Sequence, residues 1–228
     1  DSKKSGYKIA LIADNHVRDQ ETIDLTHRAL TWAIEQEPDI IAFAGDTVSY
    51  WKEGVIEMLE AALMPLEAYD GPAVAVSGNH DYFGGSPEWL RPTFDRFGIQ
   101  LLRNESVLID GVNWIGVDSA NEGMADPYSA ILQADFAHPA VVLWHEPDMV
   151  EQLPSGPDLM LSGHSHGGQF ITPWGWAPGT SRNGRKYIRG WYPDAPVPIY
   201  TSRGLGTTGP PTRLFCPPEV TLLTVESV

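Results

Sequence analysis

The sequence has very little cysteine: Cys216 is the only one among its 228 residues. A single cysteine cannot form a disulfide within the chain, so no internal disulfide stabilises this fold. The cysteine content therefore does not indicate whether the protein belongs in an oxidising or a reducing compartment. We expect Cys216 to be a small buried residue.

Positive charge is also scarce. The chain has 15 Lys and Arg residues against 30 Asp and Glu residues, a formal net charge of −15. A protein that binds nucleic-acid phosphates over a broad surface needs clustered Lys and Arg. The composition therefore predicts no broad nucleic-acid binding. We interpret a basic segment, residues 181–189, as a solvated loop, with a second phosphate site as the alternative.

Long apolar runs are missing. Runs such as residues 9–13 and 40–45 are far shorter than the roughly 18 residues that a membrane span needs. We predict no transmembrane segment, and the location stays open between the cytoplasm, membrane association and export. The chain begins with Asp1 rather than Met, which is consistent with removal of a signal or an anchor.

Apolar residues are nevertheless plentiful. Hydrophobic residues make up 42% of the chain and aromatic residues 10%, which is typical of a well-packed globular protein. A chain of this length can bury a substantial core as one domain. We predict a single domain over residues 1–228.

Apolar and amphipathic segments alternate along the chain. The pattern predicts strands at 7–14, 39–46 and 73–81 and helices at about 21–36, 54–68 and 87–97. After residue 100 the strands become short, with a hairpin turn at Asp110-Gly111. Further strands are expected at 140–148 and 159–166, with a short helix near 149–153, and in the tail at 186–191, 198–204 and 219–226. These elements fit an α/β fold in which two sheets pack together with helices outside.

Polar clusters stand at the ends of five predicted strands: DNH (14–16), GD (45–46), GNHD (78–81), WHEPD (144–148) and GHSH (163–166). Ligands gather at the carboxyl ends of strands in α/β sheets, so separate clusters can converge on one site. In a strand, residues i and i+2 point to the same face. If the strand conformation persists, Asp14 with His16, and His164 with His166, each form a ligand pair.

The clusters supply enough ligands for two metal ions that share a bridging carboxylate: Asp14, His16, Asp46, Asn79, His145, His164 and His166. Two ions about 3.5–4 Å apart can hold a hydroxide between them and clamp a phosphoryl group for in-line attack. Nitrogen and oxygen ligands without thiolate favour Mn, Fe, Zn, Co or Ni.

His80 is the candidate general acid. It lies between Asn79 and Asp81, and because adjacent side chains diverge, His80 can face the substrate while Asn79 faces metal. We expect Asp81 to orient the His80 ring. Gly163 would let the strand end turn, while Gly167 and Gly168 would leave room for substrate.

The motifs D-x-H, G-D, G-N-H-D, a lone His and G-H-x-H, in this order between residues 14 and 166, resemble the calcineurin-like metallophosphoesterase family. The resemblance implies a four-layer αββα sandwich of two mixed sheets and a dinuclear centre. It implies Asp14, His16 and His166 on one metal, Asn79, His145 and His164 on the other, Asp46 as the bridge, and His80 as the catalytic histidine. The sequences GHSHGGQ and SRGLGTTGPPTRLFCPPEV resemble a bacterial branch, often membrane-associated or exported, that includes phosphodiesterases and a UDP-2,3-diacylglucosamine pyrophosphatase. The chain departs from the family by carrying Arg18 after the first motif, which leaves the substrate class open.

Simpler interpretations of these residues stay open. Asp14 and Asp46 are also suited to capping helices, Asn79 to a turn, and His145 to a satisfied core histidine. Arg18 is an ambiguous phosphate contact. We treat the two other histidines, His27 and His138, as structural.

Taken together, the residues and the resemblance predict a metallophosphoesterase that cleaves phosphodiester or pyrophosphate bonds by attack of a metal-bound hydroxide. The expected cofactors are two divalent ions, Mn, Fe or Zn. The expected partner is a small-molecule or lipid-linked phosphate ester, with peripheral membrane association and oligomeric state left open. The alternatives are a broad-specificity phosphomonoesterase and a non-catalytic metal-binding scaffold.

Overall fold

The computed structural model describes residues 6–226. The expectation attached to Asp1 lies outside these residues. Among the described residues, no helix is both long enough and apolar enough to cross a bilayer.

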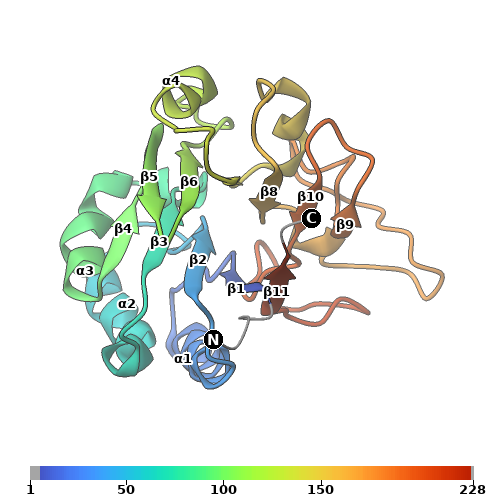
Figure 1. Cartoon of the computed structure of the whole chain (residues 1–228). Helices are drawn as coiled ribbons and strands as arrows, with labels where there is room; N and C mark the ends of the chain where they lie inside the picture. The colour runs from blue at the N-terminus through green and yellow to red at the C-terminus, as the bar shows by residue number, and fades with distance from the viewer. Residues whose placement is uncertain (1–5, 227–228) are drawn as a thin grey trace.

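The first sheet has five strands in the order β11-β1-β2-β3-β4 (Figure 1). Four of them run parallel: β1 (Tyr7–Ile12), β2 (Ile40–Ala44), β3 (Ala73–Val76) and β4 (Ile99–Leu101). The last strand, β11 (Thr221–Val225), pairs antiparallel with β1. The two ends of the described chain therefore meet in one sheet.

The second sheet has six strands in the order β5-β6-β7-β8-β10-β9. Its parallel centre consists of β6 (Val112–Val117), β7 (Ala140–Trp144), β8 (Leu159–Ser162) and β10 (Ile199–Thr201). Antiparallel strands form both edges: β5 (Glu105–Ile109) and β9 (Gly190–Tyr192). Asp110 and Gly111 both have positive φ, so the predicted hairpin turn joins β5 to β6.

The helices are α1 (Gln20–Glu35), α2 (Val55–Leu63), α3 (Arg91–Arg96) and α4 (Pro127–Leu132). Short 3₁₀ segments complete the elements: η1 (Met64–Ala68), η2 (His80–Tyr82), η3 (Pro87–Leu90), η4 (Pro147–Gln152) and η5 (His166–Gly168).

Three buried apolar clusters separate four layers. In β1, Ala10 and Ile12 face α1, whereas Ile9 and Leu11 face the second sheet, because successive strand residues alternate sides. A third cluster, which includes Trp144 and Ile131, lies between the second sheet and its outer helices. The predicted αββα sandwich of two mixed sheets is confirmed.

Some element predictions were wrong in detail. The helix expected at 87–97 is split into η3 and α3, because Pro92 has no N–H to continue the helical ladder. The strand expected at 73–81 ends at Val76. The short elements α4 and β4 were not predicted, since six and three residues are too few to give a clear periodicity.

Candidate metal centre

The predicted ligands lie in the loops that follow β1, β2, β3, β7 and β8. Within each sheet these strands are parallel, so their carboxyl ends share one edge. The two sheets pack face to face, and the loops at these strand ends meet where residues of both sheets form common groups. The predicted convergence of separate sequence motifs on one site is therefore present in the structure.

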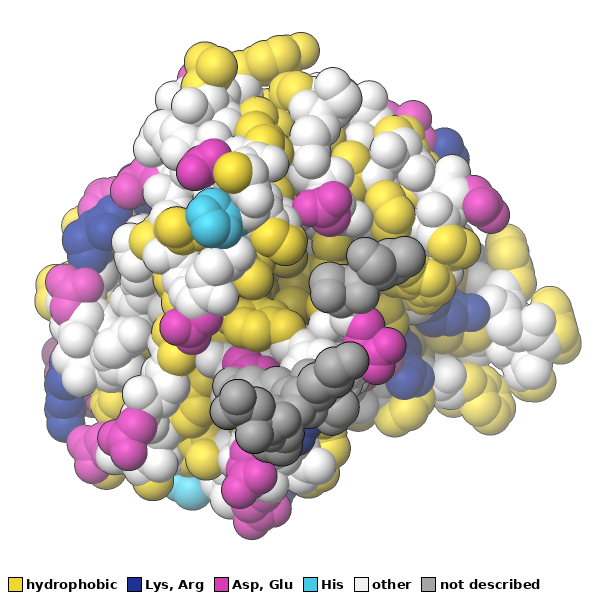
Figure 2. Space-filling model, in the orientation of Figure 1, with side chains coloured by type: hydrophobic (Ala, Val, Ile, Leu, Met, Phe, Trp, Pro, Cys, Tyr) yellow, Lys and Arg dark blue, Asp and Glu magenta, His cyan; other side chains and the backbone are white. Residues whose placement is uncertain are grey.

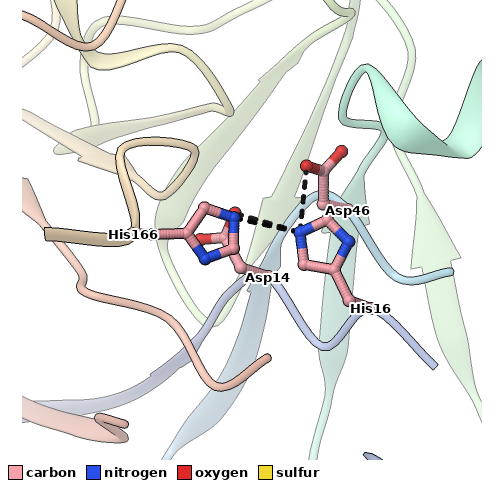
Figure 3. A group of neighbouring side chains, drawn as sticks. All are labelled: Asp14, His16, Asp46 and His166. Atoms are coloured by element: carbon pink, nitrogen blue, oxygen red, sulfur yellow. Dashed lines mark hydrogen bonds and ion pairs between the residues drawn. The ribbon is translucent and has the colours of Figure 1, made fainter. Parts of the chain in front are cut away.

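One group of side chains consists of Asp14, His16, Asp46 and His166, whose candidate ligand atoms all lie within 4.8 Å of one another. Figure 3 shows the four side chains pointing toward one another. The Nε2 atoms of His16 and His166 are 3.1 Å apart, and Asp14 Oδ1 lies 3.4 Å from His166 Nε2. All four residues are buried.

A second group consists of Asp46, His145 and His164. His145 Nε2 lies 3.1 Å from His164 Nδ1. Asp46 Oδ2 lies 3.2 Å from His145 Nε2 and 3.4 Å from His16 Nε2. One carboxylate oxygen therefore faces both groups.

The strand conformation expected for the two ligand pairs was wrong, and so was the pairing of His164 with His166, although Asp14 and His16 do fall in one group. Five of the predicted ligands have left-handed backbone instead: Asp14 (φ 53°), His16 (48°), Asp46 (52°), His164 (69°) and His166 (49°). This conformation breaks the i, i+2 rule, and it sends His164 and His166 to different groups. Positive φ is uncommon outside glycine and clusters at functional sites.

Hydrogen bonds between loops hold this backbone. The Asp14 N–H donates to the Gly45 carbonyl, and the His16 N–H donates to the Asp46 carbonyl, each over 3.0 Å. The Gly206 N–H donates to the Asp14 carbonyl over 2.6 Å. The segment after β10 thus supports the loop after β1.

Close backbone approach explains Gly163 better than the expected turn. A Cβ at Gly163 would lie 2.5 Å from Asp14 Oδ2, and one at Gly78 would lie 2.2 Å from Asp46 Oδ1. Neither space admits a methyl group. These glycines let the candidate carboxylates lie directly against the neighbouring loops.

The orientation of two histidine rings is fixed by backbone carbonyls. His145 Nδ1 donates to the Ala44 carbonyl over 2.7 Å, and His164 Nε2 donates to the Arg182 carbonyl over 2.6 Å. Each bond places the proton on one ring nitrogen and leaves the lone pair of the other facing the cluster. Ligating histidines in metal sites are typically held in this way.

The donor set fits a divalent cation. Asn79 is 9% exposed, and its Oδ1 has no hydrogen-bond partner among the described residues. A buried oxygen without a partner is costly. Imidazole nitrogens, carboxylates and an amide oxygen without thiolate are ligands for metals such as Mn, Fe and Zn.

Burial and charge shift the pKa values in opposite directions. Burial raises the pKa of Asp14 to about 7 and lowers the pKa of His16 to about 3. Burial acts on Asp46 too, but the adjacent His145 imidazole holds the Asp46 pKa well below its usual range. Asp46 conversely keeps the pKa of His145 well above its usual range despite burial. A cation at these ligands would take the place of the proton on His145.

His80 lies beside both groups but is only partly buried. Its backbone N–H donates to Asp46 Oδ1 over 2.7 Å, and its ring packs edge-on against His16 at 4.6 Å between centroids. The expected role of Asp81 was wrong. His80 Nδ1 donates to the Ser49 carbonyl over 2.8 Å, whereas the Asp81 carboxylate accepts the N–H groups of Val48 and Gly78.

The expected space at Gly167 and Gly168 is filled by the protein. A Cβ at Gly167 would lie 2.5 Å from Arg203 Cγ, and one at Gly168 would lie 2.5 Å from Ala177 Cβ. Both glycines are therefore needed for packing, and the expectation that they leave room for substrate was wrong.

Arg18 is engaged with the protein. Its guanidinium donates to Ser49 Oγ and to the carbonyl and hydroxyl of Thr207, and it lies 3.4 Å from Asp19 Oδ2. These bonds join the loop after β1 to the segment after β10. Contact between Arg18 and a substrate stays a prediction.

Asp14 and Asp46 do not cap helices, so these alternative roles were wrong. Helix α1 is capped by Asp19, and α2 begins after Gly54. The Asp14 carboxylate accepts the His164 N–H.

The histidines expected to be structural and the single cysteine lie outside both candidate ligand groups. His27 is exposed on α1, and His138 lies 4.0 Å from Asp135. Cys216 is free and buried, as expected.

Arg213 is a supporting residue that the sequence motifs did not predict. Its guanidinium donates to the carbonyls of Arg203, Gly204 and Gly206 and to the carbonyl of His166 over 3.1 Å. It therefore joins a candidate ligand to the segment that supports Asp14. The many glycines around position 205 were a signal of close backbone packing, but nothing in the sequence paired Arg213 with His166.

Two relatives match nearly the whole chain. Phosphodiesterase YaeI of Escherichia coli (strain K12) is 33% identical over 224 residues, which cover 95% of this chain and 81% of that protein. UDP-2,3-diacylglucosamine pyrophosphatase LpxG of Chlamydia trachomatis is 28% identical, with 96% of this chain and 83% of that protein covered.

A solved structure has the same fold. The protein TT1561 of Thermus thermophilus superposes with a TM-score of 0.58 at 13% identity, over 88% of this chain and 90% of that one. The model of the family described as calcineurin-like phosphoesterase matches residues 7–168. The chain therefore belongs to the calcineurin-like phosphoesterase family.

Proposed function

We propose that this metallophosphoesterase binds two divalent metal ions and hydrolyses phosphodiester or pyrophosphate bonds. The observation that carries the proposal is Asp46, whose Oδ2 lies between two buried ligand groups, 3.4 Å from His16 and 3.2 Å from His145. A carboxylate shared in this way suits a bridging ligand. The names of YaeI and LpxG support the two bond types.

The proposed ligand sets follow the two groups, with Asn79 added to the second because its buried Oδ1 has no partner among the described residues. Asp14, His16 and His166 would hold one ion, and Asn79, His145 and His164 the other, with Asp46 shared. Mn, Fe or Zn are the proposed metals. Bound there, they would supply activation of water near neutral pH and neutralise charge on the phosphoryl group.

His80 is the proposed general acid. Since its Nδ1 donates to the Ser49 carbonyl, the other ring nitrogen is available to a substrate. The ring is partly exposed, unlike the candidate ligands. It can therefore give a proton to the leaving oxygen or hydrogen-bond to a phosphoryl oxygen. The proposed task of Asp81 is to fix the loops that carry Asp46 and His80, through the bonds from Val48 and Gly78.

The proposed substrate is a small-molecule or lipid-linked phosphate ester. On the face of the molecule in Figure 2, Lys and Arg side chains stand in separate small groups rather than in one continuous patch. Together with the net charge of −15, this favours a compact substrate over a long nucleic acid. Both ends of the described chain pair within the first sheet, which supports one domain over residues 1–228.

Hydrolysis of bis(p-nitrophenyl) phosphate by chelator-stripped protein, titrated with Mn²⁺, tests the proposal. We expect activity to saturate at two metals per chain, to vanish in Asp46→Ala, and to fall by about 10²–10⁴ in His80→Ala with metal binding retained. The exposed residues Asp70 and His27 provide matched controls, Asp70→Ala and His27→Ala, that should keep full activity.

The other outcomes separate the alternatives. Faster turnover of p-nitrophenyl phosphate than of the diester would favour the phosphomonoesterase. Tight metal binding without turnover of diester, monoester or pyrophosphate would favour the non-catalytic scaffold. Saturation at one metal per chain would contradict the dinuclear centre.

A further inference from the structure

A pocket of about 520 Å³ opens between the loop after β2 and the loop after β3. Its walls include Trp51 and Gly84 from these loops, Val55 and Ile56 at the start of α2, and Trp89 in η3. Figure 1 shows α2 and α3, which η3 precedes, on the same outer side of the first sheet. The volume lies in the range of small-molecule sites, about 300–1,000 Å³.

Hydrogen bonds and ring packing join the pocket walls to the loop that carries the candidate acid, His80. The Trp51 indole N–H donates to the carbonyl of Asp81 over 2.6 Å, and Asp81 follows His80. The backbone N–H of Trp51 donates to the Phe83 carbonyl over 2.9 Å, and the Phe83 ring packs against the His80 ring at 4.3 Å between centroids. The loops that carry Asp46 and His80 therefore continue into the two walls of the pocket.

The aromatic walls are held in place by contacts within the protein. Trp51 and Trp89 pack edge to face, with ring centroids 5.1 Å apart. A Cβ at Gly85 would lie 2.3 Å from Trp51 and 2.4 Å from Trp89, so the backbone of Gly85 fits tightly between the two rings. A site whose walls are fixed in advance loses less conformational entropy on binding.

Phe83 lies between His80 and the pocket along the chain: its ring packs against His80, and the next residue, Gly84, lines the pocket. Phe83 is 44% exposed, and Trp89 is 55% exposed. Exposed rings of this size keep apolar surface in water at a cost, and contiguous apolar patches mark binding sites. Apolar side chains therefore lie both beside the polar His80, at Phe83, and in the pocket, at Trp51, Ile56 and Trp89, where Lys52 and Glu57 add charged groups to the lining.

We propose that the pocket binds the apolar organic group esterified to the phosphate on the His80 side. This inference rests on the proposed phosphodiesterase function and names a substrate class: phosphodiesters with a large apolar alcohol group. The phosphoryl group would lie at the ligand clusters, and the apolar group would pass Phe83 and contact Trp89 and Ile56. Phosphate esters of small alcohols would leave the pocket unused.

Two variants and two substrates test the pocket. Trp89→Ala removes one wall, and Glu57→Trp introduces a large side chain from an exposed position of α2 at the pocket. Bis(p-nitrophenyl) phosphate carries a second ring that can occupy the pocket, whereas methyl p-nitrophenyl phosphate does not. For each variant, kcat/KM is divided by the wild-type value for both esters, so that differences in intrinsic reactivity cancel.

We expect each variant to lower kcat/KM about tenfold more for the bis-aryl ester than for the methyl ester, mainly through KM. Trp174→Ala removes another exposed tryptophan, 79% exposed on a distant loop, and should change both esters equally. Equal losses for both esters in Trp89→Ala and Glu57→Trp would overturn the pocket while leaving the phosphodiesterase intact.

If the wild-type protein hydrolyses neither ester with Mn²⁺, the phosphodiesterase part of the proposed function fails, and the pocket is judged by binding alone. Calorimetric titration with diphenyl phosphate and dimethyl phosphate then decides. Preferential binding of the diphenyl ester that is lost in Glu57→Trp supports the pocket. Equal binding of the two esters, or binding that Glu57→Trp leaves unchanged, overturns it.

Discussion

Single glycines decide how closely the candidate carboxylates approach their neighbours. Because a Cβ at Gly78 would lie 2.2 Å from Asp46 Oδ1 and 2.4 Å from Asp46 N, we expect Gly78→Ala to displace Asp46. The variant should lose about 1–3 kcal/mol of stability and most of its Mn²⁺-dependent activity. Urea unfolding and metal content measure the two effects.

Gly179→Ala is the matched control, since a Cβ at that glycine would meet no atom within 4 Å. It should leave unfolding and metal content unchanged. A Gly78→Ala protein that keeps both metals and wild-type stability would show that the loop after β3 can move away from Asp46, contrary to the packing described above.

Arg213 acts through the backbone of the candidate ligands. Its planar guanidinium donates to the carbonyls of His166 and Gly206, and a lysine ammonium cannot reproduce this fork. We expect Arg213→Lys and Arg213→Ala to weaken metal binding about 10–100-fold, as loss of outer-sphere support typically does. Co²⁺ substitution, followed by its visible absorption spectrum, reports the geometry at the ligands independently of activity.

The exposed Arg28 on α1 supplies the control variant Arg28→Ala, which should bind Co²⁺ like the wild type. Unchanged affinity and an unchanged Co²⁺ spectrum in Arg213→Lys would mean that the guanidinium fork is dispensable, and that the segment after β10 is held by its other contacts.

At the scale of elements, Asp19 starts α1 with a capping box: its side chain accepts the Thr22 N–H. Partial burial raises the pKa of Asp19, but the Thr22 hydrogen bonds and Arg18 outweigh it and hold the pKa below its usual range. The stability that this carboxylate adds is therefore present above its unfolded pKa and is lost as pH falls through the folded value.

Asp19→Ala should accordingly cost about 1 kcal/mol at neutral pH, and the difference from wild type should shrink at acidic pH, below the ordinary aspartate pKa of about 3.9, as the folded carboxylate becomes protonated. Asp19→Asn, which keeps a good cap, should lose much less at neutral pH. Urea unfolding at both pH values measures this. A difference between Asp19→Ala and wild type that stays constant with pH would contradict the charged cap.

The carboxylate of Asp148 fixes the backbone of the loop at residues 181–189, to which Glu151 adds bonds from the Lys186 and Tyr187 side chains. The Asp148 carboxylate accepts the backbone N–H groups of Arg185, Lys186 and Tyr187, and the same loop presents the Arg182 carbonyl to His164. We expect Asp148→Ala to raise amide hydrogen exchange in this loop, measured by mass spectrometry. Exchange in α1 serves as the internal control. Equal protection of the 181–189 amides in both proteins would contradict this role of Asp148.

Sequence periodicity predicted the long elements and the order of strands and helices, because α1 and the buried strands β1 and β2 have strong patterns. The polar motifs at the strand ends also predicted which residue types meet there. Neither signal could predict the left-handed backbone at His164 and His166, since that conformation is imposed by bonds from distant loops. The same holds for Ser49 at His80, where a backbone carbonyl replaces the expected Asp81 carboxylate.

At the scale of the whole molecule, the candidate centre joins the two sheets. Asp14, His16 and Asp46 follow strands of the first sheet, whereas His145, His164 and His166 follow strands of the second. Ions held by ligands from both sheets would cross-link them. A ligand that binds only the folded state stabilises it, by about 2.7 kcal/mol at one hundred times its dissociation constant.

We therefore expect removal of metal by a chelator to lower the thermal midpoint and Mn²⁺ to restore it. Near the midpoint, 1 kcal/mol corresponds to roughly 2–4 °C in a chain of this size, so the stabilisation above amounts to about 5–10 °C. Asp46→Ala, which lacks the shared ligand, should respond much less to either treatment. If the wild-type midpoint is the same with chelator and with excess Mn²⁺, then metal binding is not coupled to the contact between the sheets, and the sandwich is held by its apolar layers alone.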